Sequence, residues 1–238
     1  MVKYKFTDLP DHCFINCKST DFDLDSHADI ADINDLENRC KLRINCFRSP
    51  SGPLKSVISI GKINKTLSVS MFLTKSEVHF GDGSCGAWDI RSWHGSRFYM
   101  SGKNVVSNGV KCVLENNSGV SIGEDCMFSD EVLLQCGSQH AVISLDDKRQ
   151  VNIDKSIISI GNHVWLGRRS TVMSSSRSID IGDGSILGIN STLTRSIPAA
   201  SLAVGSPASV VKEKVSWSNA FRCSADELNR VLSMFPGI

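Results

Sequence analysis

This chain lacks several features that would direct its interpretation. Its 238 residues carry a formal net charge of only +1, so charge gives no indication of nucleic acid or an anionic membrane as a partner. No run approaches the roughly 18 consecutive apolar residues that a membrane-spanning helix requires. The opening residues, MVKYKFTDLPDHCF, contain no apolar segment of signal-peptide length, and we expect a cytoplasmic protein.

The cysteines do not form the framework of a small secreted domain. The nine cysteines are scattered and odd in number, which favours free thiols in a reducing compartment. Cys13 and Cys17 are the closest pair, with only His12 beside them, and this set is too small to predict a metal site. We therefore expect no bound metal.

A period of six residues dominates the second half of the chain. An aliphatic residue recurs at Ile160, Leu166 and Val172, and again at Ile181, Leu187 and Leu193. Gly follows directly in four of these hexads, as Gly161, Gly167, Gly182 and Gly188. The fifth place is small or β-branched, as Val164, Ser170, Ser176, Ser185, Ser191 and Ile197. This period is typical of a parallel β-helix, in which three hexads make one triangular coil of about eighteen residues.

The pattern predicts an all-β fold in three segments. Residues 1–56 are an irregular segment, with a short helix or solvated loop over 21–38 and turn residues at 49–53. Residues 57–212 form the β-helix domain, in which 85–97 is an insertion holding Trp88, Trp93 and His94 as a packed loop or subunit contact. Residues 213–238 form a tail with a short amphipathic helix at 224–235, started by Ser224 and Glu227 in a capping box.

Two irregularities interrupt the repeat. Ile122, Phe128 and Leu134 keep the period of six, but the next position holds His140, and the chain then leaves the prism in a polar loop over 141–157. An imidazole at the root of such a loop breaks the pattern in the way expected at a functional site. The second irregularity is SSSRS at 174–178, where three extra residues must bulge outward.

Several segments together resemble the hexapeptide-repeat acyltransferases, and most closely the bacterial polysaccharide and capsular sialic-acid O-acetyltransferases. The resemblance covers about residues 118–217 and is carried by SIGEDCMFS (121–129), IGNHVWLGR (160–168), IGDGSILGINS (181–191) and AVGSPASVVKE (203–213). It implies a left-handed β-helix, an exception to the right-handed rule for parallel crossovers. It also implies a homotrimer with acetyl-CoA in the crevice between prisms, and acetyl transfer to a hydroxyl of a capsule or O-antigen sugar.

The resemblance also assigns roles to individual residues. His140 is the general base that deprotonates the carbohydrate acceptor as it attacks the thioester directly. Trp165 matches a tryptophan at the mouth of the site, where it packs on the acceptor or the pantetheine arm, and Asn152 is expected to contact the acceptor. The expected acetyl-CoA contacts are Gly167, Arg168, Gly188, Ile189, Thr194 near the adenine end, and Lys212 at the ribose phosphate.

The chain departs from its relatives at two positions. Ser138 stands where many relatives carry an Asp two residues before the histidine, so the group that orients His140 stays open between a backbone carbonyl, Asp146 and Asp147. Ser209 stands where relatives carry a second basic residue, which predicts weaker binding of the coenzyme phosphate.

Other interpretations remain open. N-acetylation of an amino sugar, often nucleotide-linked, poses the same geometric problem to His140. Cys136, four residues earlier, raises a Cys–His acyl-enzyme mechanism. A γ-type carbonic anhydrase needs three histidines on zinc, and neither His140 nor His163, expected as an outer turn residue, has a third partner at suitable spacing. A β-helix scaffold without catalysis is the most distant alternative.

Overall fold

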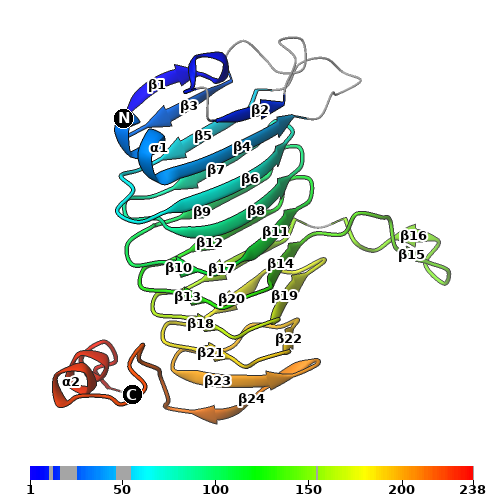
Figure 1. Cartoon of the computed structure of the whole chain (residues 1–238). Coiled ribbons are helices and arrows are strands. Elements are labelled where there is room, and N and C mark those ends of the chain that lie inside the picture. The colour runs from blue at the N-terminus through cyan, green and yellow to red at the C-terminus, as the bar shows by residue number, and fades with distance from the viewer. Residues whose placement is uncertain (11–12, 17–25, 47–54, 154, 238) are drawn as a thin grey trace.

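The computed structural model describes residues 1–10, 13–16, 26–46, 55–153 and 155–237. The chain winds into a three-sided prism whose faces are β-sheets, with one hairpin and a C-terminal helix projecting from it (Figure 1). The predictions on His12, Cys17 and residues 49–53 lie outside the described residues.

The strands of each face lie one above another in successive coils. Face 1 has the order β1 (Val2–Lys5), β3 (His27–Ile30), β5 (Val57–Ile60), β7 (Glu77–Phe80), β9 (Arg97–Met100), β12 (Gly119–Ile122), β17 (Ile157–Ile160), β20 (Ile179–Ile181). Face 2 has the order β10 (Val106–Ser107), β13 (Met127–Phe128), β18 (Trp165–Leu166), β21 (Ile186–Leu187), β23 (Ser201–Gly205), β24 (Ala208–Glu213). Face 3 has the order β2 (Phe14–Asn16), β4 (Cys40–Cys46), β6 (Leu67–Leu73), β8 (Gly86–Ser92), β11 (Val110–Leu114), β14 (Val132–Cys136), β19 (Thr171–Ser174), β22 (Thr192–Leu193).

The remaining elements lie at the ends of the prism or outside it. The short 3-10 helix η1 (Phe6–Asp8) follows β1, and helix α1 (Ile33–Arg39) lies between β3 and β4. The hairpin consists of β15 (Ile143–Ser144) and β16 (Arg149–Gln150), and helix α2 (Ala225–Ser233) lies near the C-terminus. Pairing within the faces is parallel except for β1 with β3 and β23 with β24, which are antiparallel and lie at the two ends.

The hexad positions point where the period predicts. The inward residues are buried, with Leu166, Val172, Leu187 and Leu193 at zero exposure. Val110 pairs with Val132 in the next coil, and Thr171 pairs with Thr192, so these coils are longer than the eighteen residues of three hexads, whereas the last coil, from Ile186 to Leu202, is shorter. The extra residues lie where face 3 turns into face 1, and the bulge predicted at 174–178 is one instance of this longer corner.

The prism begins earlier than the sequence predicts. Strand β3 pairs with β5 and strand β4 pairs with β6, so coils precede residue 57. In the coil of β3 and β4, α1 takes the place of a face 2 strand, and its buried Leu36 closes the core. Asp32 begins this helix by accepting from the amide of Asn34 at 2.9 Å. The period of six fails here because the face 2 strand that would supply a hexad is absent.

The interpretation of residues 85–97 as an insertion was wrong for Trp88. Strand β8 is a regular face 3 strand, and Trp88 is only 3% exposed inside the prism. Its ring meets those of Phe80, Phe98 and Phe128 edge-on, with centroids 5.6–6.1 Å apart. An aromatic cluster fills this part of the core, and within 85–97 the exposed residues are those of the turn that contains His94, and Arg97 on β9.

Among the cysteines whose side chains the structure describes, each is a free thiol, and all but Cys223 are buried: Cys13, Cys40, Cys85, Cys112, Cys126, Cys136 and Cys223. Cys126 lies at a corner of the prism at 1% exposure, and burial raises its pKa to about 12. It therefore acts as a small apolar residue rather than a reactive one.

The predicted C-terminal helix is present. The hydroxyl of Ser224 accepts from the amide of Glu227 at 3.2 Å and caps α2. The carboxylate of Glu227 accepts hydrogen bonds from Arg230 and Ser218. Within the described part of the chain, no helix is both long enough and apolar enough to cross a membrane.

Candidate active site

A column of serines marks the corner where face 3 turns into face 1. A buried serine precedes a face 1 strand in successive coils, at Ser26, Ser56, Ser76, Ser96, Ser118 and Ser156. The hydroxyl of Ser118 donates to the carbonyl of Cys136 at 3.1 Å, and the thiol of Cys136 donates to the carbonyl of Ser156 at 3.1 Å. The chain can therefore leave the prism after Cys136 and return at Ser156 without changing the register of the coils.

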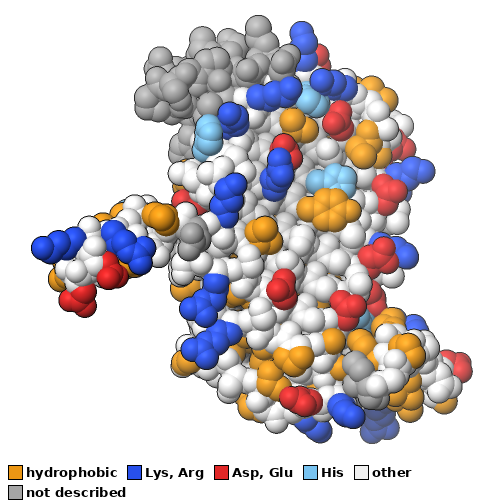
Figure 2. Space-filling model, turned by 180° about the vertical axis from the view of Figure 1, so that it is seen from behind, with side chains coloured by type: hydrophobic (Ala, Val, Ile, Leu, Met, Phe, Trp, Pro, Cys, Tyr) orange, Lys and Arg blue, Asp and Glu red, His pale blue; other side chains and the backbone are white. Residues whose placement is uncertain are grey.

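The loop between these points carries His140. Its imidazole is exposed, and the next inward aliphatic side chain after the loop is that of Ile158, which pairs with Val120. The hairpin of this loop stands clear of the prism and carries charges of both signs (Figure 2). His140 thus lies at the root of a projecting loop, at a corner open to solvent.

Asn152 ties the two arms of the loop together. Its side-chain nitrogen donates to the carbonyl of His140 at 2.8 Å, and its oxygen accepts from the amide of Val142 at 2.8 Å and from the side chain of Gln150 at 3.0 Å. Asn152 was predicted to contact the acceptor. In the structure it holds the backbone of His140 in place.

A carboxyl group that the sequence did not single out lies beneath the loop. The amide of Glu115 donates to the carbonyl of Cys136 at 2.9 Å, which places Glu115 one coil below Gly137. Burial raises the pKa of the Glu115 carboxyl, while a hydrogen bond from Gln139 and the charge of His140 act in the opposite direction. Only the length of a coil could have revealed this proximity, because Glu115 and His140 are far apart in sequence.

The position of Cys136 disfavours an acyl-enzyme. Cys136 is fully buried, and its thiol donates to the carbonyls of Gly119 and Ser156. A nucleophile must reach the thioester, and this thiol faces the interior of the prism.

Most of the predicted coenzyme contacts lie at a different corner, where face 2 turns into face 3. Gly167 and Gly188 occupy equivalent places in consecutive coils, followed by Arg168 and Ile189. A Cβ on Gly167 would lie 2.8 Å from the amide nitrogen of Ile189, so stacking of the coils already requires glycine there.

The chemistry of this corner fits an elongated anionic coenzyme. Ile189 is 64% exposed and offers an apolar surface for a pantetheine arm, and Arg168 is an exposed cation. Lys212 is also exposed, but it lies on β24 beside Leu202, toward the start of face 2. Arg168 lies 3.8 Å from Glu131, which leaves its charge partly compensated. Thr194 departs from the set, because it follows β22 at the opposite end of face 3.

Trp165 lies on face 2 and is covered in part by the C-terminal segment. Its indole nitrogen donates to the hydroxyl of Ser129 at 3.2 Å, and its ring centroid lies 6.1 Å from that of Trp217. The ring is half-buried, so one part of it can contact a ligand.

The prediction that His163 lies on the outer surface was wrong. His163 does occupy a turn, with φ of 53°, but it is only 3% exposed. Trp217 stacks on it at 4.4 Å, the carboxylate of Asp125 lies 2.7 Å from Nδ1, and the carbonyl of Trp217 lies 2.9 Å from Nε2. The covering segment comes from far along the chain, a contact that local sequence does not reveal.

The two sets of candidate residues lie apart on one chain. His140 lies at the corner of faces 3 and 1, whereas Gly167, Arg168, Gly188 and Ile189 lie at the corner of faces 2 and 3. The four residues of β19 separate these corners, on the order of 13 Å at 3.3 Å per residue. Among the described residues, no group of three or more His, Cys, Asp or Glu side chains is placed to hold a metal ion.

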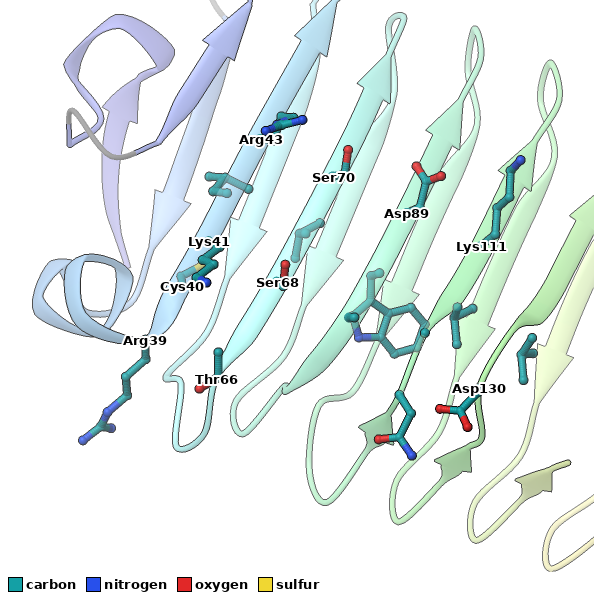
Figure 3. A pocket seen from close by; sticks show the side chains of 18 of the residues that line it. Arg39, Cys40, Lys41, Arg43, Thr66, Ser68, Ser70, Asp89, Lys111 and Asp130 are labelled. Carbon is teal, nitrogen blue, oxygen red and sulfur yellow. The ribbon is translucent and has the colours of Figure 1, made fainter. Parts of the chain in front are cut away.

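A long groove runs across the outer surface of face 3 (Figure 3). Its volume is about 1310 Å³, and it extends from α1 and β4 across β6, β8 and β11 to β14. Hydroxyl groups of Ser68 and Ser70 line it, with Asp89 and Lys111 of opposite charge further along. The groove reaches the start of β14, and the loop with His140 leaves the other end of that strand.

The inward aliphatic period and the three stacked faces define a hexapeptide-repeat β-helix protein. Residues 157–195 match the protein-family profile described as "Hexapeptide repeat of succinyl-transferase". Two solved structures share the fold over most of both chains. The polySia-specific acetyltransferase NeuO has a TM-score of 0.67 and 20% identity, covering 94% of this chain and 95% of that one. The polysialic acid O-acetyltransferase OatWY has a TM-score of 0.64 and 19% identity, covering 94% and 96%. The predicted left-handed β-helix is confirmed.

Sequence relatives point the same way. A polysialic acid O-acetyltransferase of Escherichia coli O1:K1 is 30% identical over 130 residues, which is 55% of this chain and 41% of that protein. The enzyme of the same name from Neisseria meningitidis is 35% identical over 74 residues, or 31% and 34% of the two chains. A probable acetyltransferase of Mycobacterium tuberculosis, Rv3034c, is 31% identical over 169 residues, or 68% and 52%. The resemblance to the hexapeptide-repeat acyltransferases is confirmed, and the matches span about half or less of these curated relatives.

Proposed function

We propose that this protein is an acetyl-CoA-dependent O-acetyltransferase that acts on a hydroxyl of a bacterial surface-polysaccharide sugar, in capsule or O-antigen. The observation that carries the proposal is the exposed imidazole of His140, held through its own backbone by Asn152 at a corner of a hexapeptide prism. The relatives named polysialic acid O-acetyltransferases supply the acceptor class. The free thiols suit action in the reducing cytoplasm.

His140 is the general base of the reaction. A sugar hydroxyl is a poor nucleophile until its proton is removed, and an exposed imidazole can remove it at neutral pH. Acetyl-CoA, when bound, supplies the acetyl group as a thioester. Ile189 contacts its apolar arm, Arg168 and Lys212 neutralise its phosphates, and Trp165 covers the entrance on face 2.

The enzyme acts as a homotrimer. The two corners of one chain lie a full face apart, so the base of one copy must meet the coenzyme contacts of the next. Cyclic symmetry satisfies this need, because head-to-tail contacts between unlike corners can close into a ring, and the family resemblance implies three copies. Each trimer then holds three sites, and each site draws on two chains.

The groove of face 3 holds the polysaccharide. Its hydroxyl, carboxylate and ammonium groups suit a chain of hydroxylated sugars, and it extends over several strands. From Leu133 in the groove to Cys136 at the root of the loop is three residues, or about 10 Å of strand. A sugar in a polymer lying in the groove is therefore within reach of His140.

The test is acetyl transfer by the purified protein. Acetyl-CoA would be incubated with polysialic acid, de-O-acetylated capsular polysaccharides, single sugars and amino sugars, and thiol release would be followed with a colorimetric reagent. We expect release with a polysaccharide acceptor and an O-acetyl signal in the product NMR spectrum. Transfer only to an amino group, or to no acceptor, would contradict the proposal.

A further inference from the structure

We propose that Glu115 is the positioning carboxylate of His140, in the role that Ser138 cannot fill. The inference rests on the proposed function, because it takes His140 as the general base. Glu115 acts through His140 and does not touch the reacting groups.

The backbone places Glu115 directly beneath the root of the loop. Glu115 follows β11 as Gly137 follows β14, and these strands pair up to Leu114 and Cys136. A Cβ on Gly137 would lie 2.5 Å from the Cβ of Glu115, so the loop starts in contact with this side chain. Gly137 has a φ of 92°, which favours glycine and lets the chain turn outward over the carboxyl group.

The carboxyl group has an unused acceptor. Its Oε1 atom is buried and has no hydrogen-bond partner among the residues that the structure describes. A buried oxygen that accepts no hydrogen bond lowers the stability of the folded protein. Such groups are retained where they have a functional role. The His140 ring is the ionisable group close enough to act on Glu115, and Gln139 provides the hydrogen bond to the carboxyl. We infer that a ring N–H of His140 donates to Oε1 during catalysis.

The two acids suggested by the sequence are poorly placed for this role. Asp147 accepts from the hydroxyl of Ser144 at 3.0 Å within the projecting hairpin, and Asp146 is exposed beside it. Glu115 lies on the rigid prism instead. A carboxylate there can fix the ring orientation and stabilise the imidazolium that forms when His140 takes the acceptor proton.

The direct test is the titration of His140 in the intact protein. The ring-proton NMR signal would be assigned by its loss in His140→Ala and followed with pH in wild type and in Glu115→Gln. Removing the negative charge disfavours the imidazolium, so we expect the midpoint to move to lower pH by about 0.5–1 unit. Glu115→Asp keeps the negative charge, so the His140 midpoint in this variant should lie close to the wild-type value.

Kinetics provide the second measurement. Glu115→Gln should lower kcat roughly 10-fold to 100-fold with little change in KM, and the acid limb of the pH profile should move in the same direction as the NMR midpoint. The matched control is Glu77→Gln, the same change at an exposed carboxylate that pairs with Arg97 at 3.1 Å on face 1. It should leave both measurements at the wild-type values.

Two outcomes would overturn the assignment. One is a His140 midpoint that stays unchanged in Glu115→Gln, and the other is a midpoint that moves in Asp147→Asn instead. The titration does not require turnover. If the wild-type protein were inactive on every acceptor, that result would contradict the proposed function, and the NMR titration would still test the role of Glu115.

Discussion

The two corners that border face 3 are built in opposite ways. At the corner of faces 2 and 3 the turns after β13, β18 and β21 have the same length, and Glu131, Arg169 and Asn190 repeat a left-handed φ of 55–59°. The amide of Arg169 donates to the carbonyl of Asp130, and that of Asn190 donates to Arg168. At the corner of faces 3 and 1 the turns differ in length, and only the serine column is constant.

This difference separates two tasks. The uniform corner cannot accept an insertion without breaking its stack of turns, and it presents a repeating backbone along which an extended coenzyme can lie. The variable corner accepts an insertion because the chain leaves and re-enters at fixed points, Cys136 and Ser156. The loop with His140 is inserted there, so the fold places the proposed base and the proposed coenzyme contacts on different corners.

The largest expected effect comes from removing the imidazole at the variable corner. His140→Ala should lower kcat/KM by about 10²–10⁴. Stability should change by no more than about 0.5 kcal/mol, because the ring is exposed and Asn152 bonds to the backbone carbonyl, which alanine keeps. Steady-state kinetics and thermal melts measure the two quantities.

His94→Ala is the matched control for this variant. His94 is an exposed histidine in the turn after β8, at the same corner two coils below. It should retain wild-type activity. Equal losses in the two variants would show that the corner needs histidine for some reason other than base catalysis.

Subunit mixing tests whether the two corners act together across chains. His140→Ala and the double variant Ile189→Asp/Lys212→Glu should each be nearly inactive alone. When they are co-expressed, mixed trimers contain one site with an intact base and intact coenzyme contacts, so about a quarter of wild-type activity should return. No recovery would mean that each site is built within one chain.

Sequence predicted the uniform corner better than the variable one. The period of six correctly predicted inward residues such as Leu166 and Leu187, because equivalent positions in successive coils have the same surroundings. Trp88 was missed because the early coils replace the face 2 strand by loops and lose the period. The position of Glu115 beneath the loop depends on the length of a coil. The covering of His163 by Trp217 depends on the C-terminal segment folding back onto the prism. A local sequence pattern contains neither kind of information.

A pair of truncations separates packing from binding at the uniform corner. Leu166→Ala removes a fully buried side chain and should lower the free energy of unfolding by about 2–5 kcal/mol. Ile189→Ala removes an exposed side chain and should change stability by about 0.5 kcal/mol or less while raising the KM for acetyl-CoA several-fold. Urea unfolding and steady-state kinetics distinguish them. An Ile189→Ala variant as unstable as Leu166→Ala would assign Ile189 to packing.

The smallest effect concerns the C-terminal segment that covers face 2. Glu227 accepts from Arg230 at 2.8 and 2.9 Å and from Ser218 at 2.9 Å, and these hydrogen bonds lower its pKa to about 2. A carboxyl whose pKa is depressed by folding stabilises the folded form above its ordinary pKa, and this contribution is lost as the pH falls toward the lowered value. Docking of the segment should therefore weaken between about pH 5 and pH 2, modestly because the carboxylate is partly exposed to solvent.

The fluorescence of Trp217, identified by its loss in Trp217→Phe, reports this docking because the ring stacks on His163 in the folded protein. Glu227→Gln has no charge to lose, so the part of the acid transition that belongs to the segment should disappear in that variant. Asp226→Asn, the same type of change at the preceding exposed residue, should keep it. If Glu227→Gln retained the full transition, the acid sensitivity of the segment would not come from Glu227.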